Sequence, residues 1–216
     1  MVVRILEPTN PNGVKLFGDK DNQVVHPKHT KYPHFYDIRD EVRSQFWVAD
    51  EVDMTSDVKQ FPNLSDAEQD AFLKIIGLLA TLDAPQTDLA EELASLSTDP
   101  SVKAVMSTIA DQETEHNKSY SYVLASVTTL DKQIESFELG RTDEVLLRRN
   151  AKIVEVYNEF VKNPTIENTL KAMVHTSLLE GMYFYSAFAY FYNLARQQKM
   201  IGTSTMISFI NREQIA

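Results

Sequence analysis

The sequence predicts an all-α fold, and two features of its residue distribution lead to that prediction. Glycine is scarce, with 6 in 216 residues, and the 8 prolines leave long uninterrupted stretches after residue 100. Because glycine and proline break helices, those stretches are free to be helical. Apolar residues also recur along them at steps of three and four, the period of an amphipathic helix. We therefore expect a single domain over residues 1–216, with a core supplied by its 43% hydrophobic residues.

Residues 1–44 differ from the rest of the chain and are predicted to form an irregular arm that packs on the helical body. They carry four of the eight prolines, and Asn-Pro-Asn-Gly at 10–13 is typical of a turn. The histidines His26, His29 and His34 are interpreted as surface or turn residues of this arm.

Capping residues mark the helix starts in the remainder of the chain. Ser65-Asp66-Ala67-Glu68 is a capping box, which predicts a long helix that begins near residue 65. Asp99-Pro100 and Asn163-Pro164-Thr165 predict two further starts, and the second helix runs toward residue 198. We expect another helix near 141–162 and a last one from about 203 to the end.

Charge and composition exclude several classes of function. Acidic residues outnumber basic ones by 31 to 21, so the formal charge is −10 and the pI is near 5.0. This charge is a poor match for nucleic acid or a membrane surface, and neither is expected as a partner. The absence of cysteine excludes disulfides, thiolate metal sites and a cysteine nucleophile. Because no signal peptide or long apolar run is present, we expect a cytoplasmic protein.

Polar residues lie on helix faces that should be buried. Asp83 continues the apolar stripe of the first long helix; Glu113, His116 and Tyr120 continue the next; and Glu180 lies on the stripe of the helix after residue 164. A buried, isolated carboxylate is unfavourable by several kcal/mol. Each residue taken singly could instead reach water at the stripe's edge or pair with Lys or Arg.

Taken together, these residues predict a shared metal site. Glu113 and His116 form a Glu-x-x-His unit, the ligand unit of dimetal carboxylate bundles, and Asp83 and Glu180 are candidates for single carboxylate ligands from two other helices. Oxygen-rich ligation with imidazole favours iron or manganese over zinc.

At these residues the chain resembles the small, radical-generating subunit of class I ribonucleotide reductase, a ferritin-like helical bundle. The resemblance covers about residues 35–216, in the order and spacing of the family's motifs. It rests on the Phe-Trp segment 46–53, Leu82-Asp83, Glu113-x-x-His116-x-x-x-Tyr120, Glu180-x-x-x-Phe184-x-x-x-Phe188 and the segment 206–214.

The resemblance implies a role for each of these positions. The metal ligands would be Asp83, Glu113, His116, Glu180 and Gln214, which would hold a dinuclear iron, dinuclear manganese or mixed cofactor. Tyr120 would carry the radical, and Trp47 would relay it between the metal site and the surface. The residues around them would be Glu213, Phe184, Phe188, Ile207 and Ile210.

The implied function is that of a ribonucleoside-diphosphate reductase small subunit. Its dimetal site would oxidise a tyrosine to a radical that passes to the large subunit for deoxyribonucleotide synthesis. The implied partners are that large subunit, a second copy of the chain in a homodimer, and a flavodoxin-like activase if the metal is manganese.

The end of the chain departs from the family pattern in two ways. The family has Arg-Asp-Glu-x-x-His where this chain has Arg212-Glu213-Gln214-Ile215-Ala216, so the chain stops before the histidine and a helical part of the family fold is missing. We therefore expect a truncated chain or part of a longer or split protein. Gln214 also replaces a ligand glutamate, and we expect it to weaken the second metal site.

Two other functions fit part of the pattern. A stand-alone di-iron oxidase of the same fold would need a substrate cavity beside the metals, and a metal-storage or structural helical protein would give Tyr120 no role. The presence of both Trp47 and Tyr120 favours the radical-generating subunit over the oxidase.

Overall fold

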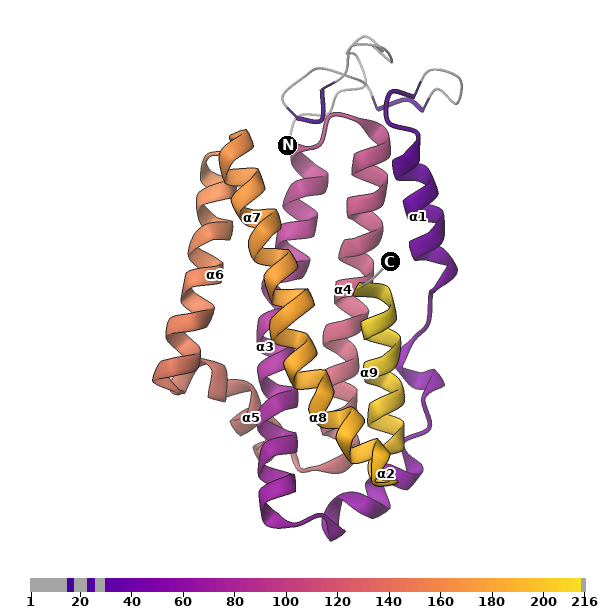
Figure 1. Cartoon of the computed structure of the whole chain (residues 1–216), viewed down its shortest axis with the longest axis vertical. Coiled ribbons are helices and arrows are strands. Elements are labelled where there is room, and N and C mark those ends of the chain that lie inside the picture. Colours follow the sequence, from indigo (N-terminus) through magenta and orange to yellow (C-terminus); the bar gives the residue numbers. More distant parts are fainter. Residues whose placement is uncertain (1–14, 18–22, 26–29, 215–216) are drawn as a thin grey trace. The chain divides into compact units, whose positions relative to one another are not determined.

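The computed structural model describes residues 15–17, 23–25 and 30–214, and it confirms the all-α prediction (Figure 1). Among these residues, the β contact is an isolated bridge between Phe17 and Ser97. No helix within the described ranges is long and apolar enough to cross a membrane. His26, His29 and the turn predicted at 10–13 lie outside the described residues.

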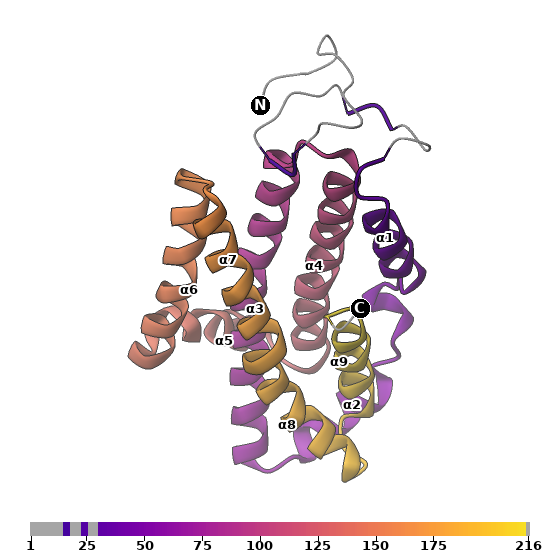
Figure 2. The same cartoon turned by 45° about the horizontal axis from the view of Figure 1, so that its top comes forward.

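The helices follow one another with short connections. They are α1 (His34–Ser44), α2 (Thr55–Gln60), α3 (Asp66–Leu96), α4 (Pro100–Val127), α5 (Leu130–Thr142), α6 (Glu144–Lys162), α7 (Ile166–Leu178), α8 (Tyr185–Arg196) and α9 (Ile201–Gln214). A π-helical segment, η3 (Leu179–Phe184), joins α7 to α8. As a result, α7, η3 and α8 form one continuous rod in both views (Figures 1 and 2).

The predicted capping residues begin three of these helices. At the start of α3, Glu68 accepts a hydrogen bond from the Ser65 backbone N–H at 2.9 Å, and the Ser65 hydroxyl accepts from the Glu68 N–H at 3.3 Å. Asp99 accepts from the Ser101 N–H at 2.9 Å at the start of α4. Thr165 caps α7 through its side chain. These bonds satisfy N–H groups that no carbonyl of the same helix can reach.

The structure adds three helices to those expected: α1, α2 and α5. Within the predicted arm, residues 34–44 form α1. Asp37 lies in its first turn and Arg43 in its last turn. A negative charge at the start and a positive charge at the end both stabilise a helix through its dipole. Residues 130–142 form α5, and the Thr129 side chain before it makes no capping hydrogen bond. The start of α5 therefore lacks the side-chain cap that marks the starts of α3, α4 and α7.

The described chain divides into two compact units. One contains the described residues up to Phe46 together with Gln86–Glu113, and the other contains Trp47–Pro85 and the described residues from Thr114 onward. The boundary falls within α3 and α4, so each of these helices contributes residues to both units. The single domain expected from the sequence stays a prediction.

In the first unit, polar side chains attach the N-terminal residues to α4 and to the turn before it. Gln112 donates a hydrogen bond to the Val42 carbonyl at 3.3 Å, and the Ser101 hydroxyl donates to the Tyr32 carbonyl at 3.0 Å. The Thr98 N–H donates to the Leu16 carbonyl at 2.8 Å.

The second unit has an aromatic and aliphatic core. Phe72 of α3 is fully buried, and its ring contacts Phe61 at 5.3 Å and Phe191 of α8 at 5.4 Å between ring centroids. Ile76 and Leu79 continue the same face of α3 and are 0% and 1% exposed, as the apolar stripe predicts. Within this unit α6 lies along α7, and α8 lies along α9.

The first half of the rod does not bury the apolar stripe that the helical period predicts for the helix after residue 164. This stripe begins with Ile166, Leu170 and Met173 and is expected to face the core, but these residues are 82%, 60% and 38% exposed, so that expectation is wrong. The buried residues of α7 are Asn168 and Ala172. The reason is that α6 packs on one side of α7, and no described element covers the apolar stripe on another side.

Gly77 allows a close approach of α3 and α5. A Cβ atom at this position would lie 2.1 Å from the Ser136 carbonyl oxygen. We expect Gly77→Ala to lower the free energy of unfolding by about 3 kcal/mol, because two backbones would have to separate. Urea unfolding measures this change.

Gly181→Ala is the matched control, since a Cβ at Gly181 meets no atom within 4 Å. The control should leave stability unchanged or raise it by up to about 1 kcal/mol through helix propensity. An unchanged unfolding midpoint for Gly77→Ala would contradict the close packing of α3 on α5.

Candidate metal centre

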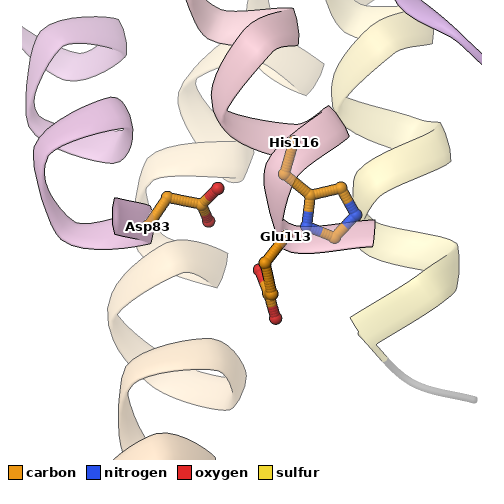
Figure 3. A group of neighbouring side chains, drawn as sticks. All are labelled: Asp83, Glu113 and His116. Atoms are coloured by element: carbon orange, nitrogen blue, oxygen red, sulfur yellow. The ribbon is translucent and has the colours of Figure 1, made fainter. Parts of the chain in front are cut away.

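Three ligand-type side chains meet where the sequence predicts a metal site. Asp83 extends from α3, and Glu113 and His116 lie one turn apart on α4 (Figure 3). Their candidate ligand atoms all lie within 4.8 Å of one another. The three residues are 0%, 7% and 2% exposed. Helical spacing explains the pair on α4, because residues i and i+3 project from the same face.

This donor set fits a divalent transition metal. Two carboxylates and one imidazole are ligands that iron and manganese accept readily. Carboxylates buried this deeply are unfavourable without a compensating positive charge or hydrogen bonds. A cation bound among Asp83, Glu113 and His116 would supply that charge directly.

Of the other two predicted ligands, Glu180 lies outside this group of three. Glu180 is the second residue of η3, and its Oε2 atom is buried. Gln214 is the last residue of α9, and its two side-chain amide atoms are buried without a hydrogen bond to any residue in the described ranges. The structure therefore brings Asp83, Glu113 and His116 together, and the roles of Glu180 and Gln214 stay predictions.

A buried carboxylate orients the imidazole of His116. The Nε2 atom of His116 lies 2.8 Å from Oε2 of Glu213 on α9, and the two side chains are 2% and 3% exposed. Because a carboxylate accepts, this contact favours the tautomer with the proton on Nε2. The Nδ1 atom is then the nitrogen that is available to a metal ion.

Tyr120 lies one helical turn after His116 in a fully buried position. It is 0% exposed, and Phe184 and Phe188 are 1% and 0% exposed with ring centroids 6.1 Å apart. Ile207 and Ile210, the two α9 residues expected near the site, are also fully buried. These side chains keep water away from their part of the second unit.

Trp47 is buried against α9. It is 3% exposed, and its indole lies 5.3 Å from the Phe209 ring, measured between centroids. Close by in the chain, the Ala49 N–H donates to Glu115 of α4 at 2.7 Å. Sequence reasoning did not single out Glu115, because its partner is 66 residues away and nothing local indicates the bond.

The sequence model of one protein family matches this chain over residues 25–216, and that family is the ribonucleotide reductase small chain. A ribonucleoside-diphosphate reductase subunit beta from Halalkalibacterium halodurans is 45% identical over 199 residues. That match covers 92% of this chain and 58% of the relative, so the chain spans less than two thirds of the relative's length.

Solved structures show the same relationship. A class I ribonucleotide reductase structure from Bacillus halodurans is 49% identical, with a TM-score of 0.81 over 84% of this chain and 65% of that chain. The ribonucleotide reductase R2 subunit from Clostridium botulinum is 35% identical, with a TM-score of 0.86 over 97% of this chain and 64% of that chain. With its family motifs, matching fold and buried carboxylate–histidine cluster, the chain belongs to the ribonucleotide reductase small-chain family.

Proposed function

We propose that this chain forms the radical-generating part of a ribonucleoside-diphosphate reductase small subunit. The observation that carries the proposal is the buried group of Asp83, Glu113 and His116, followed one turn later on α4 by the fully buried Tyr120. By itself, a carboxylate–imidazole site explains only metal binding. The tyrosine beside it adds a residue that can be oxidised out of contact with water.

Asp83, Glu113 and His116 would hold a dinuclear iron or manganese cofactor, with Glu180 and Gln214 as the remaining ligands. Such a cofactor supplies one-electron oxidation when it is bound. Tyr120 would lose one electron and its phenolic proton, which leaves a neutral tyrosyl radical. Its burial protects the radical from water and soluble reductants.

Two contacts of α9 suggest a route between this region and Trp47. His116 contacts Glu213, and Phe209, one turn earlier on the same helix, contacts Trp47. We propose that oxidising equivalents pass along this route to the large subunit, which reduces the nucleotide. The homodimer and, for a manganese cofactor, the flavodoxin-like activase are further proposed partners, and the proposed location is the cytoplasm.

Electron paramagnetic resonance after metal loading tests the proposed function. The chain is loaded with Fe(II) in air, and in parallel with Mn(II) and superoxide, and its metal content is measured. We expect up to two metal ions per chain and a tyrosyl signal with at least one metal. Two bound ions without that signal under either condition would favour the oxidase alternative. Many ions per chain would favour metal storage.

A further inference from the structure

A buried carboxylate of α2 caps the helix that carries Glu213 and Gln214. Asp57 is 0% exposed, and its Oδ1 atom accepts a hydrogen bond from the Gly202 N–H at 3.0 Å. Its Oδ2 atom accepts from the Thr203 N–H and from the Thr203 hydroxyl, both at 2.7 Å. The N–H groups in the first turn of α9 have no partner inside the helix, so Asp57 satisfies them from another element. Its negative charge also complements the positive end of the helix dipole.

Gly202 makes this contact possible. A Cβ atom there would lie 2.8 Å from the Asp53 carbonyl oxygen and 3.2 Å from Oδ1 of Asp57. A side chain at this position would therefore move α2 and α9 apart. Because Gly202 has no side chain, the Asp57 carboxylate can reach the backbone of α9 directly.

The turn before α9 is held in an unfavourable backbone conformation. Gln198 and Met200 have φ angles of 60° and 51°, in the left-handed region that side chains disfavour. The Gln60 side chain donates to the Gln198 carbonyl at 3.2 Å and accepts from the Met200 N–H at 2.8 Å. A conformation of this kind persists only where its surroundings determine it strongly.

An ion pair between Lys199 and Glu68 adds to these restraints. Lys199 Nζ lies 2.5 Å from Oε1 of Glu68 at the start of α3. The hydrogen bond from Lys199, with those from Ser65, lowers the pKa of Glu68 to about 2. The turn is thus attached to α2 through Gln60 and to α3 through Glu68.

The opposite end of α9 contacts the candidate metal centre through Glu213. Phe209 contacts Trp47, and Glu213 contacts His116 at 2.8 Å. About ten residues separate Thr203 from Glu213, which corresponds to about 15 Å of helix. A regular helix of this length is stiff, so a shift or rotation at its first turn reaches its last turn.

We propose that Asp57 is a positioning residue, which sets the axial position and rotation of α9 and thereby places Glu213 and Gln214 against α4. The functional meaning of this placement rests on the proposed function, whereas the placement itself can be tested without metal. Asp57 would act through Glu213 and His116, without touching the metal.

Asp57→Asn is the central variant. It keeps the size of the side chain, but it removes the charge and turns an NH₂ group toward a backbone N–H. In the metal-free chain, we expect the ¹⁵N resonance of His116 Nε2 to shift because its contact with Glu213 changes. The emission of Trp47, the sole tryptophan, should change as well because Phe209 moves with α9. Both signals are measured in the absence of denaturant.

Two further variants separate positioning from general destabilisation. Ile153→Ala removes a buried side chain of α6, so it should lower the urea midpoint while leaving both signals unchanged. Thr203→Val removes one of the three hydrogen bonds to Asp57, and it should shift both signals in the same direction as Asp57→Asn but less. This graded variant keeps the test decisive if Asp57→Asn does not fold.

Unchanged His116 and Trp47 signals in both Asp57→Asn and Thr203→Val would overturn the proposal, whatever happens to the midpoint. If the signals shift as expected and the wild-type chain binds no metal, the positioning role stands and the proposed function fails. When the wild-type chain does bind Mn(II), we expect Asp57→Asn to weaken that binding about tenfold.

Discussion

Tyr120→Phe is expected to abolish the tyrosyl radical completely and to leave metal binding unchanged. Phenylalanine fills nearly the same volume in this fully buried position but has no phenolic hydroxyl to lose a proton and an electron. The ligand group of Asp83, Glu113 and His116 is untouched. Electron paramagnetic resonance and metal analysis on the same loaded sample measure the two quantities.

The matched control is Tyr157→Phe. Tyr157 is also buried, at 5% exposure, and its hydroxyl lies 3.0 Å from the Thr176 hydroxyl in the contact of α6 with α7. This variant should keep the radical signal at full intensity. A signal that survives in Tyr120→Phe with the same hyperfine structure would assign the radical to another tyrosine.

Gln214→Glu is expected to tighten the second metal site by about 100-fold, equivalent to about 2.7 kcal/mol. Two divalent ions carry four positive charges, whereas Asp83, Glu113 and Glu180 supply three negative ones. Both amide atoms of Gln214 are buried, so a carboxylate there would be poorly solvated and would bind a cation strongly. The wild-type chain should hold its second ion weakly.

Calorimetric titration with Mn(II) measures both sites. Gln197→Glu adds the same charge at an exposed position after α8, and it should leave the second affinity at the wild-type value. In the absence of metal, Gln214→Glu should unfold at lower urea concentration than the wild-type chain, because its new charge is buried without a partner. Equal, tight binding of two ions by the wild-type chain and Gln214→Glu would show that the missing charge is unimportant.

Glu213 could in principle supply the negative charge that Gln214 lacks, and its contact with His116 bears on that alternative. A local adjustment of α9 could turn Glu213 into a ligand in place of Gln214. In the structure, Glu213 is bonded to His116 at 2.8 Å with both side chains buried. Recruiting Glu213 would break this buried hydrogen bond, and the loss of a buried hydrogen bond is unfavourable. The structure therefore favours a weak second site over a rearranged one.

Sequence reasoning located the parts of the site that depend on local geometry. Glu113, His116 and Tyr120 share one face of one helix, so their spacing alone predicts that they project together. Asp83 could be added to this predicted group of ligands because it interrupts an apolar stripe, and the structure confirms that this stripe is buried. Capping residues predicted the starts of α3, α4 and α7 for the same reason, since a cap and its helix are adjacent in the chain.

Features that depend on distant partners could not be predicted in this way. The apolar period of α7 shows that Ile166 and Leu170 share a face, but it does not show which face a neighbouring helix covers. Glu180 lies in a π-helical segment, where the side chains are rotated from the directions that a regular helix assigns to them. Asp57 carries no local signal at all, because its partners are 145 and 146 residues away.

That separation between Asp57 and the start of α9 has a consequence for the order of folding. Contacts between distant residues form late, because the entropy of the intervening chain must be lost before the contact contributes. The helices α3 to α8 can pair with their neighbours in sequence first, and α9 joins α2 only when the loop of 145 residues closes. During synthesis, Asp83, Glu113 and His116 leave the ribosome long before Glu213. From loop length alone, we expect Asp83, Glu113 and His116 to be able to meet before α9 orients His116.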